Sequence, residues 1–189
     1  MENIMCFFWN KKKFNIIVAT KNMMEAYDRK RDYNLSMAIA TKILKCDSQN
    51  LDALYYRGSS YYTLKNYKAA KKDFDNFLSK IPNNPHVRLL HGSCCMELAN
   101  NITKHSKKTK KTIINILEIT EIAIKDFNTI IAVIDTAKDD EFGFKIDGKR
   151  KTKSEAEVEA KEYLNYAKGI KEMANNSLGR EFKFRKSLK

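Results

Sequence analysis

Apolar residues recur at helical spacing along most of this chain, and polar, turn-forming residues interrupt the pattern. Between Leu51 and Asn84 two such stripes follow one another, and each predicts a short amphipathic helix. The first stripe consists of Leu54, Gly58, Tyr61 and Leu64, and the second of Tyr67, Ala70, Phe74, Phe77 and Leu78. Asn50 and Asn66 precede the stripes as N-caps, and Pro82 ends the second. The segment therefore predicts two antiparallel helices.

Two small residues mark the place where these helices are expected to cross. Gly58 on the first helix and Ala70 on the second allow the backbones to approach closely. Tyr61 and Phe74 then fill the space on either side of the crossing. The spacing of small and aromatic residues is thus a packing requirement of the helix pair.

The same spacing recurs upstream and, in part, downstream. Shifting back by one repeat aligns Tyr27 with Tyr61, and shifting forward places Gly92 on Gly58. The pattern resembles the tetratricopeptide repeat, a helical hairpin of 34 residues. The residues that carry the resemblance are Tyr27, Tyr33, Leu54, Gly58, Tyr61, Tyr67, Ala70, Phe74, Pro82, Gly92, Ala123 and Phe127. In the third repeat, Ala123 and Phe127 take the places of Ala70 and Phe74 only after an insertion.

The resemblance implies an all-α protein, a right-handed helical-hairpin solenoid of about three repeats with a C-terminal capping helix. We expect a lead segment at 1–16 that covers the first hairpin, repeats at 17–50, 51–84 and 85–137, a charged loop at 138–153, a capping helix at 154–176 and a basic tail at 177–189. The third repeat carries a basic insertion near 99–112, which its polar, lysine-rich sequence predicts to be a loop. Asn175 to Gly179 is the expected C-cap of the last helix.

In this family the first helix of each repeat lines a concave groove that binds a partner. The resemblance therefore implies a groove lined by Lys21, Glu25, Asp28, Tyr55, Ser59, Tyr62, His86, Leu89, Ser93 and Met96. This surface begins with mixed charge and becomes aromatic and apolar, which favours an apolar peptide or an amphipathic helix as the ligand. Packing against the chain's own C-terminal helix fits these residues equally well, so the sequence leaves both occupants open.

Some members of the family hold the acidic tails of heat-shock chaperones in a carboxylate clamp of Lys, Asn and Arg residues. Only Lys21 matches that clamp. Glu25 and Tyr56 replace its two Asn residues, His86 replaces its second Lys, and Leu90 replaces its Arg. An acidic tail would meet a carboxylate and find no guanidinium fork. We therefore expect no clamp function.

A net charge of +13 brings in a second class of function, nucleic-acid or anionic-surface binding through the lysine-rich loops and tail. Only seven of the 36 basic residues are arginine, which is the better reader of phosphates. Apart from Phe144, the loops place no aromatic residue among their lysines to stack on bases, whereas the tail has Phe182 and Phe184. We keep this function as the alternative to protein binding.

Residue patterns typical of catalysis or of ion binding are missing from the sequence. It has no glycine-rich phosphate loop, no zinc-protease motif and no nucleophile elbow, and its four cysteines and three histidines form no metal-ligand series. We expect neither enzymatic activity nor a cofactor or metal, and we expect reduced thiols in a cytoplasmic protein. No signal peptide is recognised, and charges such as Glu118 and Lys125 argue against a transmembrane span.

The pattern as a whole predicts a non-catalytic protein-interaction module, such as an adaptor, a co-chaperone-like protein or an assembly scaffold. Its partner is another protein or peptide, and self-association is left open.

Overall fold

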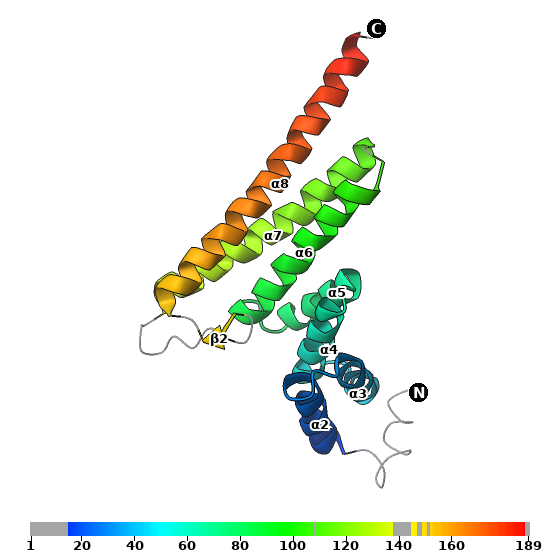
Figure 1. Cartoon of the computed structure of the whole chain (residues 1–189), viewed down its shortest axis with the longest axis vertical. Helices are drawn as coiled ribbons and strands as arrows, with labels where there is room; N and C mark the ends of the chain where they lie inside the picture. The colour runs from blue at the N-terminus through cyan, green and yellow to red at the C-terminus, as the bar shows by residue number, and fades with distance from the viewer. Residues whose placement is uncertain (1–14, 108, 138–144, 147–148, 151, 188–189) are drawn as a thin grey trace. The chain divides into compact units, whose positions relative to one another are not determined.

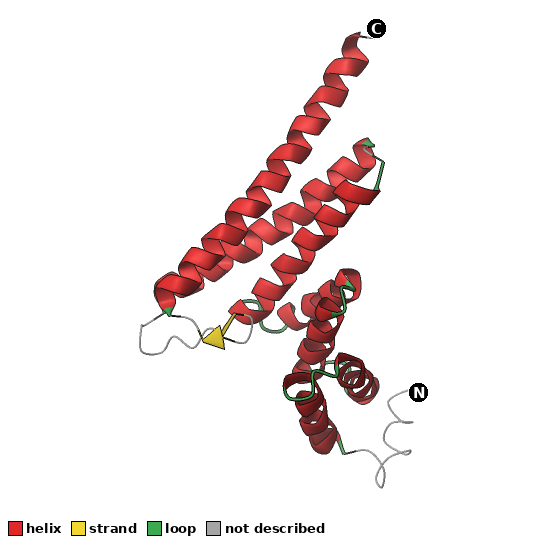
Figure 2. Cartoon of the chain, in the orientation of Figure 1, coloured by secondary structure: helices red, strands yellow, loops and turns green. Residues whose placement is uncertain are grey.

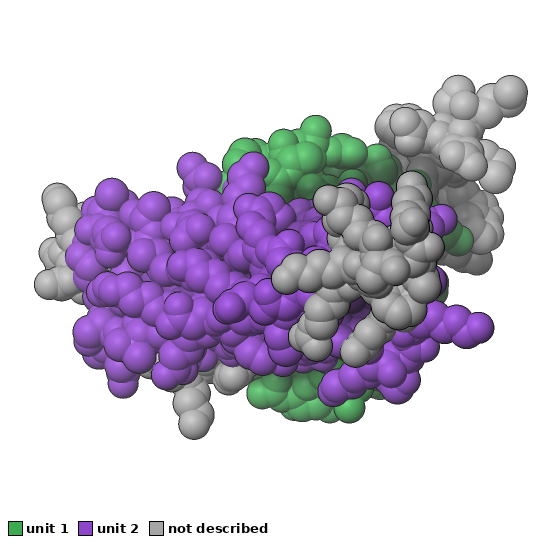
Figure 3. All heavy atoms as spheres, turned by 90° about the horizontal axis from the view of Figure 1, so that it is seen from above, with its two compact units in different colours: residues 1–82 green, residues 83–189 purple. Residues whose placement is uncertain are grey.

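The computed structural model describes residues 15–107, 109–137, 145–146, 149–150 and 152–187. Helices dominate these residues (Figures 1 and 2), and the strands among them are one antiparallel pair, β1 (Lys145–Ile146) and β2 (Lys149–Arg150). The chain divides into two compact units, residues 1–82 and 83–189 (Figure 3). Most of the predicted lead segment, residues 1–14, lies outside the described residues, as do residues 138–144 of the predicted charged loop.

The first unit holds two helical hairpins, α2 (Ile16–Asp28) with α3 (Tyr33–Cys46) and α4 (Leu51–Thr63) with α5 (Tyr67–Leu78). Helix α4 also contacts α2 and α3. The expected N-caps are confirmed, since the Asn50 and Asn66 side chains accept the amides of Ala53 and Ala69. Each cap satisfies a backbone donor that the first turn leaves unpaired and so fixes where its helix begins.

The two hairpins turn in the same way. Arg31 and Lys65, one repeat length of 34 residues apart, have φ angles of 54° and 61°. Each lies directly before the N-cap of the following helix, Asp32 for α3 and Asn66 for α5. A residue in the left-handed backbone conformation helps to reverse the chain direction within a few positions. The second helix of each hairpin therefore folds back on the first.

The predicted helix crossing is a direct contact between glycine and an aromatic ring. A Cβ atom on Gly58 would lie 2.7 Å from Cε1 of Phe74, and one on Gly92 would lie 2.8 Å from Cζ of Phe127. Both rings are fully buried. The close approach requires glycine at these two positions, because any side chain would occupy the space that the ring fills.

The second unit is an antiparallel bundle of α6 (Pro85–His105), α7 (Lys110–Thr136) and α8 (Lys153–Ser187), in which α7 contacts both neighbours (Figure 1). Asn84 caps α6 and Pro85 occupies its first turn, as the sequence predicts. Alanines on α8 face α7 and allow close packing, and this stripe consists of Ala156, Ala160, Ala167 and Ala174. Isoleucines of α7 complete the core of the unit.

Two predicted helix ends are wrong. Helix α6 continues to His105 through the first half of the expected loop, because Ala99 and Ile102 extend its apolar stripe against α7. Helix α8 continues past Gly179 to Ser187, so Asn175 to Gly179 is not a C-cap. Leu178 packs on the cluster that contains Ala174, one turn earlier. In both places tertiary packing outweighs local polar composition.

The described cysteines differ in oxidation state. Cys94 and Cys95 are fully buried in α6 and carry reduced thiols, as predicted. Cys46 is disulfide-bonded, so the expectation of a reduced thiol is wrong at that residue. Cys6 lies outside the described residues.

Among the described residues, none of the helices combines the length and the low charge that a membrane crossing requires.

Candidate functional site

Six of the predicted groove residues lie in the first unit, namely Lys21, Glu25 and Asp28 on α2 and Tyr55, Ser59 and Tyr62 on α4. Helices α2 and α4 contact one another, and α2 provides the charged positions while α4 provides the tyrosines. We define the α2–α4 face as Lys21, Glu25, Asp28, Tyr55, Tyr56 and Tyr62. Lys21 and Asp28 are exposed, the other four residues are partly exposed, and the predicted groove residue Ser59 is buried beneath them.

Tyrosine rings pack edge to face across this region. Tyr27 meets Tyr33 at a centroid distance of 5.1 Å and Tyr56 at 5.4 Å. Tyr55 and Tyr56 are neighbours at 5.2 Å, and Tyr62 packs on Tyr67 at 5.6 Å. Edge-to-face pairs of this kind hold the rings in fixed orientations. The face is therefore a preformed aromatic surface.

The pKa values of Tyr27, Tyr55 and Tyr56 are raised, which favours their neutral phenol form. Burial raises the pKa of Tyr27 and of Tyr55 above the ordinary tyrosine value. Burial also raises the pKa of Tyr56, and the Asp28 carboxylate, which accepts the Tyr56 hydroxyl at 3.2 Å, raises it further. Neutral phenols offer an apolar ring together with a hydrogen-bonding tip, a combination enriched at protein interfaces.

The charged end of the face is mixed, as the sequence predicts. Glu25 and Asp28 lie on the same helix as Lys21, the single residue that matches a carboxylate clamp. The Glu25 carboxylate is 3.6 Å from Lys30 Nζ, in a pair whose side chains are both exposed. Two carboxylates beside one lysine oppose an acidic ligand, because like charges repel where a clamp needs cations.

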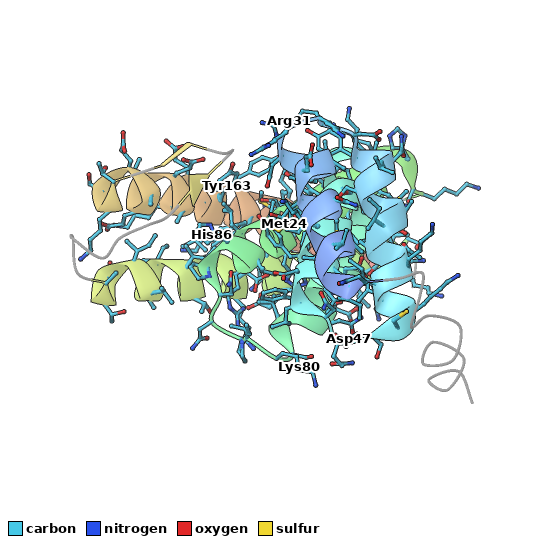
Figure 4. The ribbon with its side chains drawn as sticks, turned by 90° about the horizontal axis from the view of Figure 1, so that it is seen from below. Met24, Arg31, Asp47, Lys80, His86 and Tyr163 are labelled. Carbon is cyan, nitrogen blue, oxygen red and sulfur yellow. The ribbon has the colours of Figure 1, made fainter. Side chains whose placement is uncertain are left out.

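The four predicted groove residues of the third repeat lie in the second unit. Leu89, Ser93 and Met96 are buried there, and His86 (labelled in Figure 4) is half-buried in the first turn of α6. Leu89 and Met96 belong to the core cluster that also contains Ala156, Ala160 and Leu164 of α8. For Leu89 and Met96 the structure therefore favours packing within the chain over an external ligand.

The sequence interpretation missed a set of buried ion pairs beside the helix crossings. Arg57 donates two hydrogen bonds to Asp73, of 2.8 Å from Nε and 2.7 Å from Nη2. In the second unit, Asp126 accepts Arg88 Nη1 at 2.5 Å, and its other oxygen lies 2.5 Å from His91 Nδ1. These groups join the two helices of each crossing, so we assign them to stability.

A signal for these pairs is present in the sequence. Asp73 and Asp126 each directly precede the crossing phenylalanine, and Arg57 and His91 each directly precede the crossing glycine. The charges therefore recur in register with the packing motif. No group of three or more His, Cys, Asp or Glu side chains that could hold a metal ion occurs within the described part of the chain.

A solved tetratricopeptide-repeat (TPR) domain has an arrangement of helices similar to that of this chain. The first TPR of Spaghetti (RPAP3), bound to the HSP90 peptide SRMEEVD, matches with a TM-score of 0.51 at 14% identity, over 79% of this chain and 93% of that one. The MamA RS-1 ArsTM double mutant gives 0.47 at 13% identity over 90% and 84% of the two chains. MamA MSR-1 C2 gives 0.46 at 14% identity over 91% and 86%. No family model matches the sequence. The likeness to the RPAP3 domain shows that this chain has the TPR fold.

Proposed function

We propose that this chain is a non-catalytic protein-interaction module that binds an apolar peptide or amphipathic helix of a partner protein on its α2–α4 face. The observation that supports this most strongly is the set of partly exposed tyrosines with ordered ring contacts, which includes Tyr55 and Tyr62, two residues predicted to line the groove. A solved TPR domain of this fold holds a peptide, the HSP90 sequence SRMEEVD.

The partner's chemistry is expected to differ from that of SRMEEVD. That peptide is acidic, whereas the α2–α4 face carries two carboxylates, Glu25 and Asp28, and one cation, Lys21. Each large apolar side chain that the partner buries on the tyrosines would contribute about 1.5–3 kcal/mol, before the cost of ordering the peptide. Binding by this face is thus driven by apolar contact, with the charges setting orientation.

The alternative, nucleic-acid or anionic-surface binding, rests on charge composition alone. Its segments are the basic stretches at 104–111, 145–153 and 180–189, of which residues 108, 147–148, 151 and 188–189 lie outside the described residues, and the described contacts give it no additional support.

The Tyr55→Ala/Tyr62→Ala double variant tests the proposal. Affinity capture with this variant is expected to retain at least about tenfold less of the partner than the wild-type chain, because the apolar contact area is removed. The matched control is Leu35→Ala/Ile81→Ala, which removes two exposed apolar side chains of the same unit outside the face. Circular dichroism must show equal helix content in all three proteins.

Equal capture by wild type and the tyrosine variant would refute the proposed function. If the double variant unfolds, Tyr62→Ala alone is used instead. The ring contact described for Tyr62 is with Tyr67, so this change leaves the contact between Tyr55 and Tyr56 in place.

A further inference from the structure

Two lysine-rich stretches of the sequence come together at one end of the second unit. The first, residues 104–111, includes the turn between α6 and α7. Helix α8 returns to the same end, because its Leu178 and Ile102 of α6 both pack against the cluster that contains Ile113 of α7. Beyond Leu178 the helix continues past the turn (Figure 1), and this continuation contains the second stretch, residues 180–187. We call the two stretches together the basic end.

Positive charge is concentrated at the basic end. Its two stretches contain nine basic residues and one acidic residue, and so account for +8 of the chain's net charge of +13. The sequence has no Asp or Glu from Leu98 to Leu117, and Glu181 is the only one from Met173 to Ser187. Both chain segments that meet at this end are therefore almost free of negative charge.

The lysines of the turn are available to a ligand. All those that the structure describes are exposed, namely Lys104, Lys107, Lys110 and Lys111. The ion pairs described in the second unit join other residues and leave these four lysines uncompensated. The turn thus presents several cations whose charge no described carboxylate of the unit neutralises.

The acidic residues between α7 and α8 are tied to the opposite end of the unit. There, Lys153 Nζ donates to the Ala137 carbonyl at 2.8 Å, so the segment 138–152 leaves from and returns to the same place. A segment of this length that returns to its start reaches at most about 25 Å from it. Helix α7 has 27 residues and is about 40 Å long. The carboxylates of that segment therefore cannot reach the basic end.

Two lysines of the turn lie where a helix disfavours positive charge. Lys110 and Lys111 open α7, whose first turn has no acidic residue. The start of a helix carries partial positive charge, so each lysine there costs about 0.3–1 kcal/mol. The turn is nevertheless ordered, because Thr109 and Thr112 form a capping box. An anionic ligand would relieve this unfavourable charge.

Apolar surface beside the lysines favours a protein segment over nucleic acid as that ligand. Ile114 is 38% exposed and shares a side of α7 with Lys110 and Lys111, which precede it by four and three residues. The turn contains neither an arginine to grip phosphates nor an aromatic residue to stack on bases. A peptide that carries an apolar residue among its carboxylates matches both features.

From this arrangement we infer that the basic end binds an acidic segment of a partner protein, with its carboxylates on the lysines of the turn and an apolar residue on Ile114. The inference does not depend on the proposed function of the α2–α4 face, because the two surfaces share no residue. Their charge preferences also differ, since Glu25 and Asp28 oppose an acidic ligand on the α2–α4 face.

Three labelled probes test the site by fluorescence anisotropy with the full chain at physiological salt. The first is an amphipathic peptide of Glu and Leu, the second replaces every Glu by Gln, and the third is a single-stranded RNA with as many negative charges as the first. The Glu/Leu peptide is expected to bind at least about tenfold more tightly than either of the others. Long-range attraction to the chain's net charge acts on the RNA and the Glu/Leu peptide alike, so a preference between them reports the site itself.

Charge reversal then locates the binding. Lys110→Glu/Lys111→Glu is expected to weaken the Glu/Leu peptide by about tenfold or more, and it should fold, because acidic residues suit the first turn of a helix. The matched control, Lys42→Glu/Lys45→Glu, makes the same change of charge at exposed positions of α3 and should stay within about twofold of wild type. Tyr55→Ala/Tyr62→Ala should bind this peptide as the wild type does, which separates the basic end from the α2–α4 face.

A second reversal tests whether the two stretches act together. Lys183→Glu/Arg185→Glu changes the α8 stretch and is expected to weaken the Glu/Leu peptide by about threefold or more, because both stretches contribute to one field. Wild-type affinity in this variant would overturn the joint site.

The inference is also overturned if Lys110→Glu/Lys111→Glu binds the Glu/Leu peptide as tightly as the α3 control. Tighter binding of the RNA than of the peptide would overturn it in favour of nucleic acid as the occupant. Should circular dichroism show that the reversed variant does not fold, Lys110→Gln/Lys111→Gln replaces it, with an expected loss of about threefold to tenfold.

Discussion

Asp126→Ala is expected to lower the free energy of unfolding of the 83–189 unit by about 3–5 kcal/mol. The Asp126 side chain is only 3% exposed and receives both Arg88 and His91 from α6. Removing the carboxylate takes away the contacts that the largely buried Arg88 guanidinium and the buried His91 imidazole make with Asp126. The desolvation penalty of these groups then falls on the folded state.

Cys94 and Cys95 provide a local readout of this loss, because both thiols are fully buried in α6. The rate at which a thiol-alkylating reagent modifies these cysteines in native buffer, measured by mass spectrometry of the peptide that contains them, should rise by a factor of at least about 100 in Asp126→Ala. Glu118→Ala, an exposed change on the same helix, is the control and should stay within about 0.5 kcal/mol of wild type. A loss below about 1 kcal/mol for Asp126→Ala would contradict the structural role assigned to the ion pairs.

Phe74→Ala is expected to destabilise the first unit by about 3–5 kcal/mol, because the fully buried ring fills the crossing against Gly58.

Gly58→Ala probes the same contact from the other side. The added methyl would lie within 3 Å of the ring, and overpacking costs about 1–3 kcal/mol against a helix-propensity gain of about 1 kcal/mol. We expect a net loss of stability, measured by hydrogen exchange of peptides covering α4 and α5.

Gly169→Ala is the matched control for the glycine substitution. A Cβ at Gly169 has no neighbour within 4 Å, so this change on α8 should stabilise by about 0.5–1 kcal/mol. A double-mutant cycle sharpens the test, since Gly58→Ala should be tolerated better in the Phe74→Ala background, where the ring is missing. If Gly58→Ala stabilises the wild-type chain as Gly169→Ala does, the close crossing is not a constraint on this fold.

The helical hairpins could be predicted from the sequence because two independent signals agreed there. Apolar periodicity gave each helix, and Asn50, Asn66 and Asn84 gave the positions where helices begin. The extent of α6 and α8 could not be predicted from the same signals. Ile102 and Leu178 extend these helices by long-range packing, and the polar residues around them resemble a loop and a cap when read locally.

The candidate site was only partly predictable for a related reason. Periodicity indicates which residues share a helix face, and the resemblance to the repeat family predicted which of these faces, including Lys21, Glu25 and Tyr55, line a groove. It does not indicate which faces a later helix will cover, so Leu89 and Met96 were expected in a groove and lie in a core with α8. Asp126 likewise reads as a solvated charge that interrupts an apolar helix, until its register with Asp73 and the crossing phenylalanines is considered.

Hydroxyl-radical footprinting of the chain with and without its captured partner tests the central functional claim most directly. Oxidation at Tyr55 and Tyr62 is expected to fall on binding, because a ligand on the α2–α4 face shields both rings. Met173 on α8, which is 61% exposed, is the internal reference and should be oxidised equally in both samples. Unchanged oxidation of Tyr55 and Tyr62 in a complex that is demonstrably intact would contradict the claim that this face holds the partner.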